Sequence, residues 1–542
     1  MISRRVSAAL GVLAFIGCLV APAGAQLANE GERCAPDEPE MSPHRYLRSV
    51  SLDVRGVVPT LEEYAALDAA LAEMPEGEDQ KVEGVLPWFE AQIDTWMDTP
   101  EFTERVVRRH QALLWNNLSN VRLFNNNVNM QRAGDLYYRA NIGQRLYRGA
   151  RVACLDEPAE FGPEGEVLFQ TDENGVRREG WVWVNPYWAP ESRIKVCAFD
   201  AQAAETSPTG TDCGSSAAYR DTACGCGPDL QWCQYRGQTN NAIVAGMAEA
   251  MKRRMALVAE ASTPYIDLFR TRRTWINGPL AFFYRHQRKI TGGLAFDPGP
   301  LPDYLIPELE FTEADTWVEV ELPASHAGVL TDPAFLLRFQ TNRARANRFY
   351  DAFLCQPFTP PDAPLPVADE AAALEPDLQR RAGCKYCHAL LEPSAAYWGR
   401  WNEQGAGFLD PQGYPQVRDD CLTCAQEGGG CSADCRRYYV TQALSDAEAP
   451  YLGTLRAYLF RRDPHMRNVE MGPELLALTA VADGRIPQCA ATRTAEWLLG
   501  RDLDVKESTW AAELSADFVY SDYSYRQLIK AVLTSSVYRR VR

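Results

Sequence analysis

Cys384-Lys385-Tyr386-Cys387-His388 is the most informative stretch of this chain. Two cysteines separated by two residues and followed directly by histidine form the pattern that attaches a c-type haem. The thiols of Cys384 and Cys387 would add to the two vinyl groups of the porphyrin, and their spacing places them about one helical turn apart. The imidazole of His388 would be the proximal ligand of the iron. The stretch therefore predicts a cytochrome c-like segment with one covalent haem c.

The ligand on the opposite face of the iron would decide what the haem does. A distal methionine raises the potential and suits electron transfer, whereas an open position admits peroxide or gases. Met466 and Met471 are candidate distal ligands, and His465 is a third candidate. Asp463-Pro464 predicts the start of a loop there, which would let these side chains fold back over the ring. An open iron site is the alternative.

The first 25 residues have the features of a secretory signal peptide. Arg4 and Arg5 form a basic start, an apolar run follows over 8–20, and Ala23-Gly24-Ala25 resembles a cleavage site. Haem c is attached outside the cytoplasm, so we expect an exported protein in the periplasm or at the cell surface. Phe15-Ile16-Gly17-Cys18 partly resembles a lipobox, and a lipid anchor at Cys18 is the alternative. No later stretch has the roughly 20 apolar residues that a membrane span needs.

Composition and charge narrow the classes of partner. The chain has 542 residues, of which 46% are hydrophobic and 23% are charged, as expected for a folded protein of several segments. Its formal net charge is −17, and loss of the leader with its two arginines would make the charge more negative. Such a surface repels nucleic acid and anionic lipid. We therefore expect no nucleic-acid partner, and a redox partner protein with a basic docking surface would suit this charge.

Cysteine usage predicts disulfides formed in an oxidising compartment. Of the 16 cysteines, one would leave with the leader and two would bind the haem, so thirteen remain. Because thirteen is odd, at least one thiol is left over, and Cys34 is the candidate. Cys355 and Cys489 are isolated in the sequence. The others form two groups, for which disulfides are favoured over zinc, and these groups are Cys154, Cys197, Cys213, Cys224, Cys226 and Cys233, then Cys421, Cys424, Cys431 and Cys435.

The predicted fold is mainly α. We expect a multi-segment helical protein with a cysteine-rich, partly β insert and a cytochrome c-like haem segment. The predicted parts are a signal peptide (1–25), an N-terminal helical region (26–150), a Cys-rich insert with a β-hairpin (151–240), a central region (241–357), a proline-rich linker (358–370), the haem-attachment segment (371–440) and a C-terminal helical region (441–542).

Local patterns predict individual elements within this outline. Thr60-Leu61-Glu62-Glu63 is a capping box that opens a helix through about Leu71. Thr99-Pro100 opens another helix, and His110 falls on its apolar face as a core residue. One β-hairpin is predicted from 167–169, an Asn-Gly turn and 181–184. Further helices are predicted over 369–382, 451–460, 473–482, 490–499 and 525–539.

Several stretches resemble an exported family of planctomycete-type cytochrome c-like proteins, whose other segments are domains of unknown function. Leu52-Asp53-Val54-Arg55-Gly56-Val57-Val58-Pro59-Thr60-Leu61-Glu62-Glu63 is similar to the family's LDLTGLPPTPEE run. The other similar stretches, in the family's order, are Thr99-Pro100-Glu101-Phe102 with Arg109-His110, Asn277-Gly278-Pro279-Leu280-Ala281, 328–336, Leu354-Cys355-Gln356-Pro357, Cys489, 499–503 and 528–538. The resemblance covers about two-thirds of the chain and leaves out the 151–240 insert and the 421–435 cysteines.

The haem segment departs from the family pattern at two residues, of which the loss of methionine is the one that raises the question of ligation. The family has Cys-x-x-Cys-His-x-x-Met-Asp-Pro, whereas this chain has Leu391-Glu392-Pro393 at the last three positions. A methionine three residues after His388 would lie on the same side of the ring as the histidine. Its loss therefore bears on the family match rather than on haem binding. The resemblance implies an exported, haem-bearing protein and no particular reaction.

Three functions from different classes follow. The first is a mono-haem electron-transfer protein of the periplasm or cell surface. The second is a haem-dependent oxidoreductase or peroxidase-like enzyme. The third is a haem-free, disulfide-stabilised secreted scaffold, in which Cys384 and Cys387 form a disulfide or bind a metal with His388.

Overall fold

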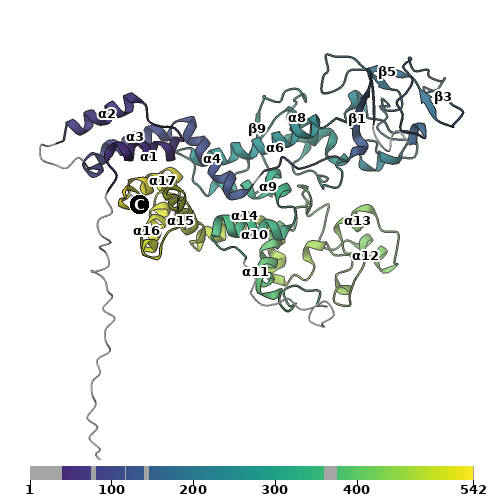
Figure 1. The fold of residues 1–542 in the computed structure, drawn as a ribbon. Helices are drawn as coiled ribbons and strands as arrows, with labels where there is room; N and C mark the ends of the chain where they lie inside the picture. The colour runs from purple at the N-terminus through teal and green to yellow at the C-terminus, as the bar shows by residue number, and fades with distance from the viewer. Residues whose placement is uncertain (1–39, 75–80, 116, 140–145, 359–374, 541–542) are drawn as a thin grey trace, which may run out of the picture.

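The structure is a computed structural model that describes residues 40–74, 81–115, 117–139, 146–358 and 375–540. The predicted leader with Cys18, the predicted leftover thiol Cys34 and most of the predicted proline-rich linker lie outside these residues. The described chain is mainly α, as predicted, with small sheets (Figure 1). None of its helices is long and apolar enough to cross a bilayer.

The N-terminal region begins with four helices, of which the capping signals predict the second and the fourth. They are α1 (Pro43–Arg55), α2 (Leu61–Ala72), α3 (Leu86–Met97) and α4 (Pro100–Leu114). The capping box is confirmed: the Thr60 hydroxyl accepts from the Glu63 amide at 3.2 Å, and the Glu63 carboxylate accepts from the Thr60 amide at 2.8 Å. Two helix N-H groups thus gain partners, which fixes the start of α2.

His110 is a core residue, as its helical spacing predicts. It is fully buried on α4, and its Nδ1 bonds the Val106 carbonyl at 2.8 Å. Burial lowers the pKa of His110 to about 4, because the charged imidazolium would lose its hydration. The histidine is therefore neutral in the folded protein at every pH above that value.

The buried His110 makes stability depend on pH. Between about pH 6.5 and pH 4 the unfolded chain binds a proton at this residue and the folded chain does not, so acid favours unfolding. We expect wild type to lose about 1.4 kcal/mol per pH unit in this window relative to His110→Gln, which has no titrating ring. Urea unfolding of both proteins at four pH values measures this difference, and parallel curves would contradict it.

A five-stranded mixed sheet forms the cysteine-rich part and extends beyond its predicted start. Its order is β5-β6-β2-β1-β7, and its strands are β1 (Asn129–Ala133), β2 (Leu136–Arg139), β5 (Trp181–Val184), β6 (Ile194–Cys197) and β7 (Gln234–Tyr235). The prediction of a helical region over 26–150 is thus wrong for residues 129–139, which form β1, β2 and the turn between them. Gly134, at φ 59°, makes the tight turn between β1 and β2. The pair Gly134-Asp135 is a turn signal from which this hairpin could have been predicted.

The predicted hairpin forms with a different second strand. β3 (Phe169–Thr171) pairs with β4 (Arg177–Glu179), with Phe169 opposite Glu179, and Gly175 takes φ 76° in the connecting turn. The Trp181–Val184 strand pairs instead with β6. A turn this short brings together only the residues next to it, so the apolar run further on is left for the larger sheet.

Disulfides join the cysteines of both predicted groups. The pairs are Cys154–Cys197, Cys213–Cys224, Cys226–Cys233, Cys421–Cys435, Cys424–Cys431 and Cys355–Cys489. The prediction of disulfides in both groups is confirmed. The two cysteines that are isolated in the sequence pair with each other across 134 residues.

One large hydrophobic core connects the N-terminal, central and C-terminal helices. The Tyr46 hydroxyl of α1 donates to the Leu533 carbonyl at 2.8 Å, so the two ends of the described chain pack together, as Figure 1 shows. The central and later elements are α6 (Gln238–Ala256), α7 (Asp267–Arg270), β8 (Arg273–Ile276), α8 (Gly278–Phe282), β9 (Val318–Glu321), α9 (Pro333–Arg338), α10 (Asn342–Leu354), α11 (Lys385–Ala395), α12 (Asp419–Gln426), α13 (Ala433–Tyr438), α14 (Asp463–Ala482), α15 (Arg485–Leu499), α16 (Ser508–Tyr520), α17 (Tyr525–Thr534) and α18 (Ser536–Arg539).

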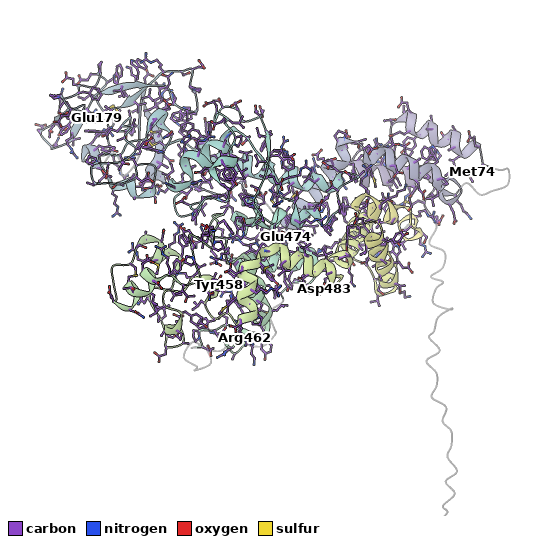
Figure 2. All side chains as sticks on the ribbon, turned by 180° about the vertical axis from the view of Figure 1, so that it is seen from behind. Met74, Glu179, Tyr458, Arg462, Glu474 and Asp483 are labelled. Carbon is purple, nitrogen blue, oxygen red and sulfur yellow. A yellow bond between two sulfur atoms is a disulfide. The ribbon has the colours of Figure 1, made fainter. Side chains whose placement is uncertain are left out.

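Three local predictions around the motif are corrected. The described part of the predicted helix over 369–382 consists of turns from 375, and the helix begins only at Lys385. Residues 451–460 contain two short 3-10 turns rather than an α-helix. Asp463-Pro464 starts helix α14 instead of a loop, because proline is well tolerated in a first helical turn. In Figure 2 Arg462 and Tyr458 lie near the start of α14, far from Glu179 in the cysteine-rich part.

Candidate haem-attachment site

The CxxCH motif lies at the start of helix α11. Gly383 takes φ 76°, a conformation that favours glycine, and the chain then turns into the helix. The amides of Cys387 and His388 donate to the Cys384 carbonyl at 3.3 and 3.0 Å. Helical geometry therefore begins at Cys384, whose backbone is already in the right-handed helical region. This arrangement separates the two thiols by about one turn, as haem attachment requires.

Both motif cysteines lie outside the six disulfides, and both are partly exposed. The neighbouring Lys385 and Tyr386 are exposed, so one side of the motif faces outward. The motif therefore presents two thiols at the protein surface and fits thioether formation.

The His388 ring is held by a carboxylate one helical turn away. Its Nδ1 and the Glu392 Oε1 are 2.7 Å apart, and the two residues have the i, i+4 spacing that places side chains on one helix face. A carboxylate only accepts hydrogen bonds when it is ionised, so this contact assigns the imidazole proton to Nδ1. The Nε2 lone pair is then available to a metal, which is the usual arrangement of metal-binding histidines.

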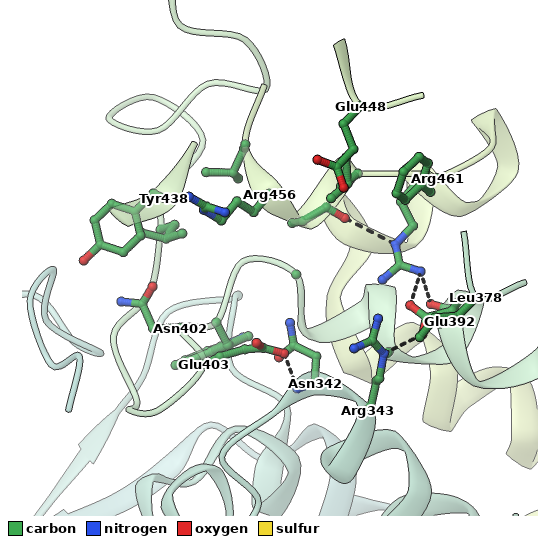
Figure 3. Close-up of a pocket in the computed structure, with 18 of the residues that line it drawn as sticks. Asn342, Arg343, Leu378, Glu392, Asn402, Glu403, Tyr438, Glu448, Arg456 and Arg461 are labelled. Atoms are coloured by element: carbon green, nitrogen blue, oxygen red, sulfur yellow. Dashed lines mark hydrogen bonds and ion pairs between the residues drawn. The ribbon is translucent and has the colours of Figure 1, made fainter. Parts of the chain in front are cut away.

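Glu392 is in turn held by two arginines from distant segments. The Arg343 Nε of α10 donates to Oε1, and the Arg461 Nη1 donates to Oε2 at 3.0 Å and to the Glu392 carbonyl at 2.7 Å (Figure 3). Burial alone would raise the pKa of Glu392, but Arg343, Arg461 and the hydrogen bond to His388 outweigh burial and lower it. The carboxylate therefore stays ionised at neutral pH although its side chain is only 7% exposed.

The three candidate distal ligands lie on helix α14. This helix contacts α11, since the Asn468 Nδ2 donates to the Pro393 carbonyl at 3.0 Å. His465 is partly buried, and burial followed by repulsion from Arg461 and Arg462 lowers its pKa. Met466 packs against the core cluster of the 421–435 cysteines, and its sulfur accepts from Gln416.

Met471 is the most exposed of the candidate ligands, at 49%. It is separated from Met466 by more than one helical turn and lies next to Gly472, where the helix is kinked at φ 72°. The structure therefore brings His388, Glu392 and Arg461 together, whereas Met466 contacts Gln416 and the core cluster of the 421–435 cysteines. Glu392 was not predicted as a site residue. Its position four residues after His388 on a helix could have indicated a contact between the two side chains. Arg343 and Arg461 had no such local signal.

A cavity of about 490 Å³ is lined in part by Glu392. Its wall includes the carboxylate that holds His388, together with Arg343 and Arg461 (Figure 3). Further polar lining comes from Asn342, Asp377, Gln379, Asn402, Glu403, Glu448, Arg437 and Arg456. The cavity and the motif thus share Glu392.

Metal ligation by the disulfide-rich groups does not fit the chemistry of their sulfurs. Two clusters of the described residues have metal-like spacing, namely Cys154, Glu179 and Cys197, and Asp420, Cys421 and Cys435. In both, the two cysteines are bonded to each other. A zinc site needs thiolates, so these sulfurs are not available to it.

No protein-family model matches this chain, and neither a curated protein nor a solved structure matches it. The family resemblance of the sequence stays a prediction, and the functional argument rests on the chemistry of the site.

Proposed function

We propose that this chain is an exported c-type mono-haem protein that transfers electrons to or from a partner protein. Cys384 and Cys387 would hold the haem through thioether bonds, and the His388 Nε2 would ligate its iron. The observation that carries the proposal is the His388–Glu392 contact of 2.7 Å, which orients the ring and leaves Nε2 for a metal. The disulfides of the described chain agree with an oxidising compartment, which export would provide.

When bound, haem supplies a site for one-electron exchange. The residues of this chain would set how readily that exchange occurs. A carboxylate on Nδ1 makes the imidazole a stronger donor and favours ferric iron. Arg343 and Arg461 draw the charge of Glu392 toward themselves and weaken this effect. The acidic exterior would in turn suit a basic partner surface.

A haem-dependent enzyme is the second candidate function. The observation that favours it is the placement of the methionines, because Met466 contacts Gln416 and Met471 is half exposed. An open distal position would follow if neither ligates the iron. Carbon monoxide binding to the reduced protein tests this directly. If two axial ligands occupy the iron, carbon monoxide should not change the absorption spectrum of the reduced protein. If the distal position is open, the spectrum should change to that of a carbon monoxide complex.

Glu392→Gln tests the role of the carboxylate. The amide can still accept from Nδ1 but carries no charge, so the imidazole becomes a weaker donor to ferric iron. We expect the midpoint potential to rise by about 60 mV, which corresponds to a tenfold change in the preference for ferric over ferrous iron. Spectroelectrochemical titration measures it.

Glu392→Asp is the matched control, since it keeps the charge and shortens the side chain by one methylene. Its potential should stay closer to wild type than that of Glu392→Gln. A Glu392→Gln potential equal to wild type would contradict the assignment of Glu392 as the partner of the proximal histidine. A smaller amount of covalently bound haem in both variants would instead indicate a role of Glu392 in folding.

A further inference from the structure

The cavity beside Glu392 has the size and the walls of a small-molecule site. Its volume of about 490 Å³ lies within the range of roughly 300–1,000 Å³ that is typical of ligand pockets. Amide side chains of Asn342, Gln379 and Asn402 contribute to a polar lining. A ligand that fills this space would therefore be small and polar.

Two guanidinium groups in this wall share one carboxylate. Arg343 uses Nε for Glu392, and Arg461 uses Nη1, as Figure 3 shows. Within the described part of the chain, no hydrogen bond is made by Nη1 or Nη2 of Arg343 or by Nη2 of Arg461. The Arg461 side chain is 12% exposed, so water compensates little of its charge. Both guanidinium groups therefore keep N-H donors that a ligand in the cavity could meet.

The other acids of the lining are Asp377, Glu403 and Glu448, and among the described residues none of them forms an ion pair with Arg343 or Arg461, although the charge of Asp377 acts on Arg461. The Glu403 carboxylate accepts from the Asn342 amide at 2.8 Å, and the Glu448 carboxylate accepts from the Leu444 amide at 2.8 Å. Glu392 is the only carboxylate of the described residues that forms an ion pair with Arg343 or Arg461. The two guanidinium groups therefore retain donors for a ligand.

We propose that Arg343 and Arg461 bind the carboxylate of a small polar organic acid in this cavity. Guanidinium groups recognise carboxylates through paired, charge-assisted hydrogen bonds, and a partly buried setting strengthens them. The body of the acid lies against the amide side chains of the wall. The same chemistry could come from a free acid or from a propionate of the covalent haem, and the experiment below separates these sources.

Occupancy of the cavity reaches His388 through Glu392, and this step rests on the proposed haem site. A bound carboxylate draws both guanidinium groups away from Glu392, which leaves more negative charge on the oxygen that accepts from Nδ1. The imidazole then becomes a stronger donor and favours ferric iron. Saturating acid should therefore lower the midpoint potential of the haem-loaded protein.

Isothermal titration with succinate tests the site in two forms of the full chain, the haem-loaded protein and the haem-free Cys384→Ser/Cys387→Ser variant. We expect binding that Arg343→Gln weakens about 10- to 100-fold, the effect of losing a charge-assisted hydrogen bond. Arg343 is 52% exposed, so this variant should fold. Arg467→Gln, which removes an exposed charge of α14 outside the cavity wall, is the matched control and should bind like wild type.

The outcomes separate the sources of the carboxylate. Binding to both forms supports a free acid, and binding to the haem-free form alone assigns the two arginines to a haem propionate. No succinate binding to either form, or equal weakening by Arg343→Gln and Arg467→Gln, would overturn the proposal. Binding with an unchanged midpoint potential would overturn the coupling through Glu392. Because the haem-free form is titrated as well, failure of the haem assignment does not hide a functional anion site.

Discussion

The Cys384→Ser/Cys387→Ser variant should carry no covalent haem when it is produced in a host that matures c-type cytochromes. Wild type should be coloured, and its colour should remain with the polypeptide after denaturation, because thioether bonds survive unfolding. The serine hydroxyls cannot replace the thiols, which are the groups that add to the porphyrin. Intact-mass spectrometry and a pyridine haemochrome assay measure the loss, which should be complete.

A motif-preserving variant is the control for this experiment. Lys385→Ala/Tyr386→Phe changes the two residues between the cysteines, whose side chains are exposed, and should retain the haem. His388→Ala should remove the proximal ligand and leave a protein with altered or absent haem absorption. A colourless wild-type protein with the mass of the bare polypeptide would contradict the proposal of a redox function. The haem-free secreted scaffold would then be the remaining function.

The parts of the structure that sequence could predict are those set by neighbouring residues. The capping box of Thr60 and Glu63, the proline at the start of α4 and the helical burial of His110 all depend on residues within one or two turns. The motif is local in the same sense, since the helix begins at its first cysteine. Grouped cysteines also predicted disulfides, because thiols that lie close together in the sequence have partners nearby when the compartment is oxidising.

The parts that sequence could not predict depend on residues brought together from far apart. Trp181–Val184 is equally apolar whether it pairs with β3 or β6, and only the larger sheet decides between them. The arginines that hold Glu392 lie 49 and 69 residues from it along the chain. Asp463-Pro464 shows that a local signal can also be ambiguous, because the same two residues suit either a loop or a first helical turn.

Removing the Cys355–Cys489 disulfide should produce the largest loss of stability among the six disulfides. This bond joins the end of α10 to α15 across 134 residues, so it limits the unfolded chain more than any other described disulfide. In the chain-entropy account the cost rises with loop length, which gives about 5 kcal/mol here and about 2 kcal/mol for Cys226–Cys233, whose cysteines are 7 residues apart. Double alanine variants of both pairs, unfolded in guanidinium under oxidising conditions, measure this difference.

The short disulfide is a useful control because both its cysteines are buried, as is Cys489 in the long one. Loss of the sulfur atoms removes buried packing at both cysteines of the short pair but only at Cys489 of the long pair, because Cys355 is exposed. A larger loss of stability for the long pair would therefore come from the length of its loop rather than from packing. Equal losses would show that local packing rather than the unfolded chain sets the contribution of these bonds. A larger loss for Cys355 and Cys489 would show that the helices before and after the CxxCH motif depend on this covalent link. In that case the disulfide between these two cysteines would stabilise the helices α10 and α15, which lie on either side of the CxxCH motif in the sequence.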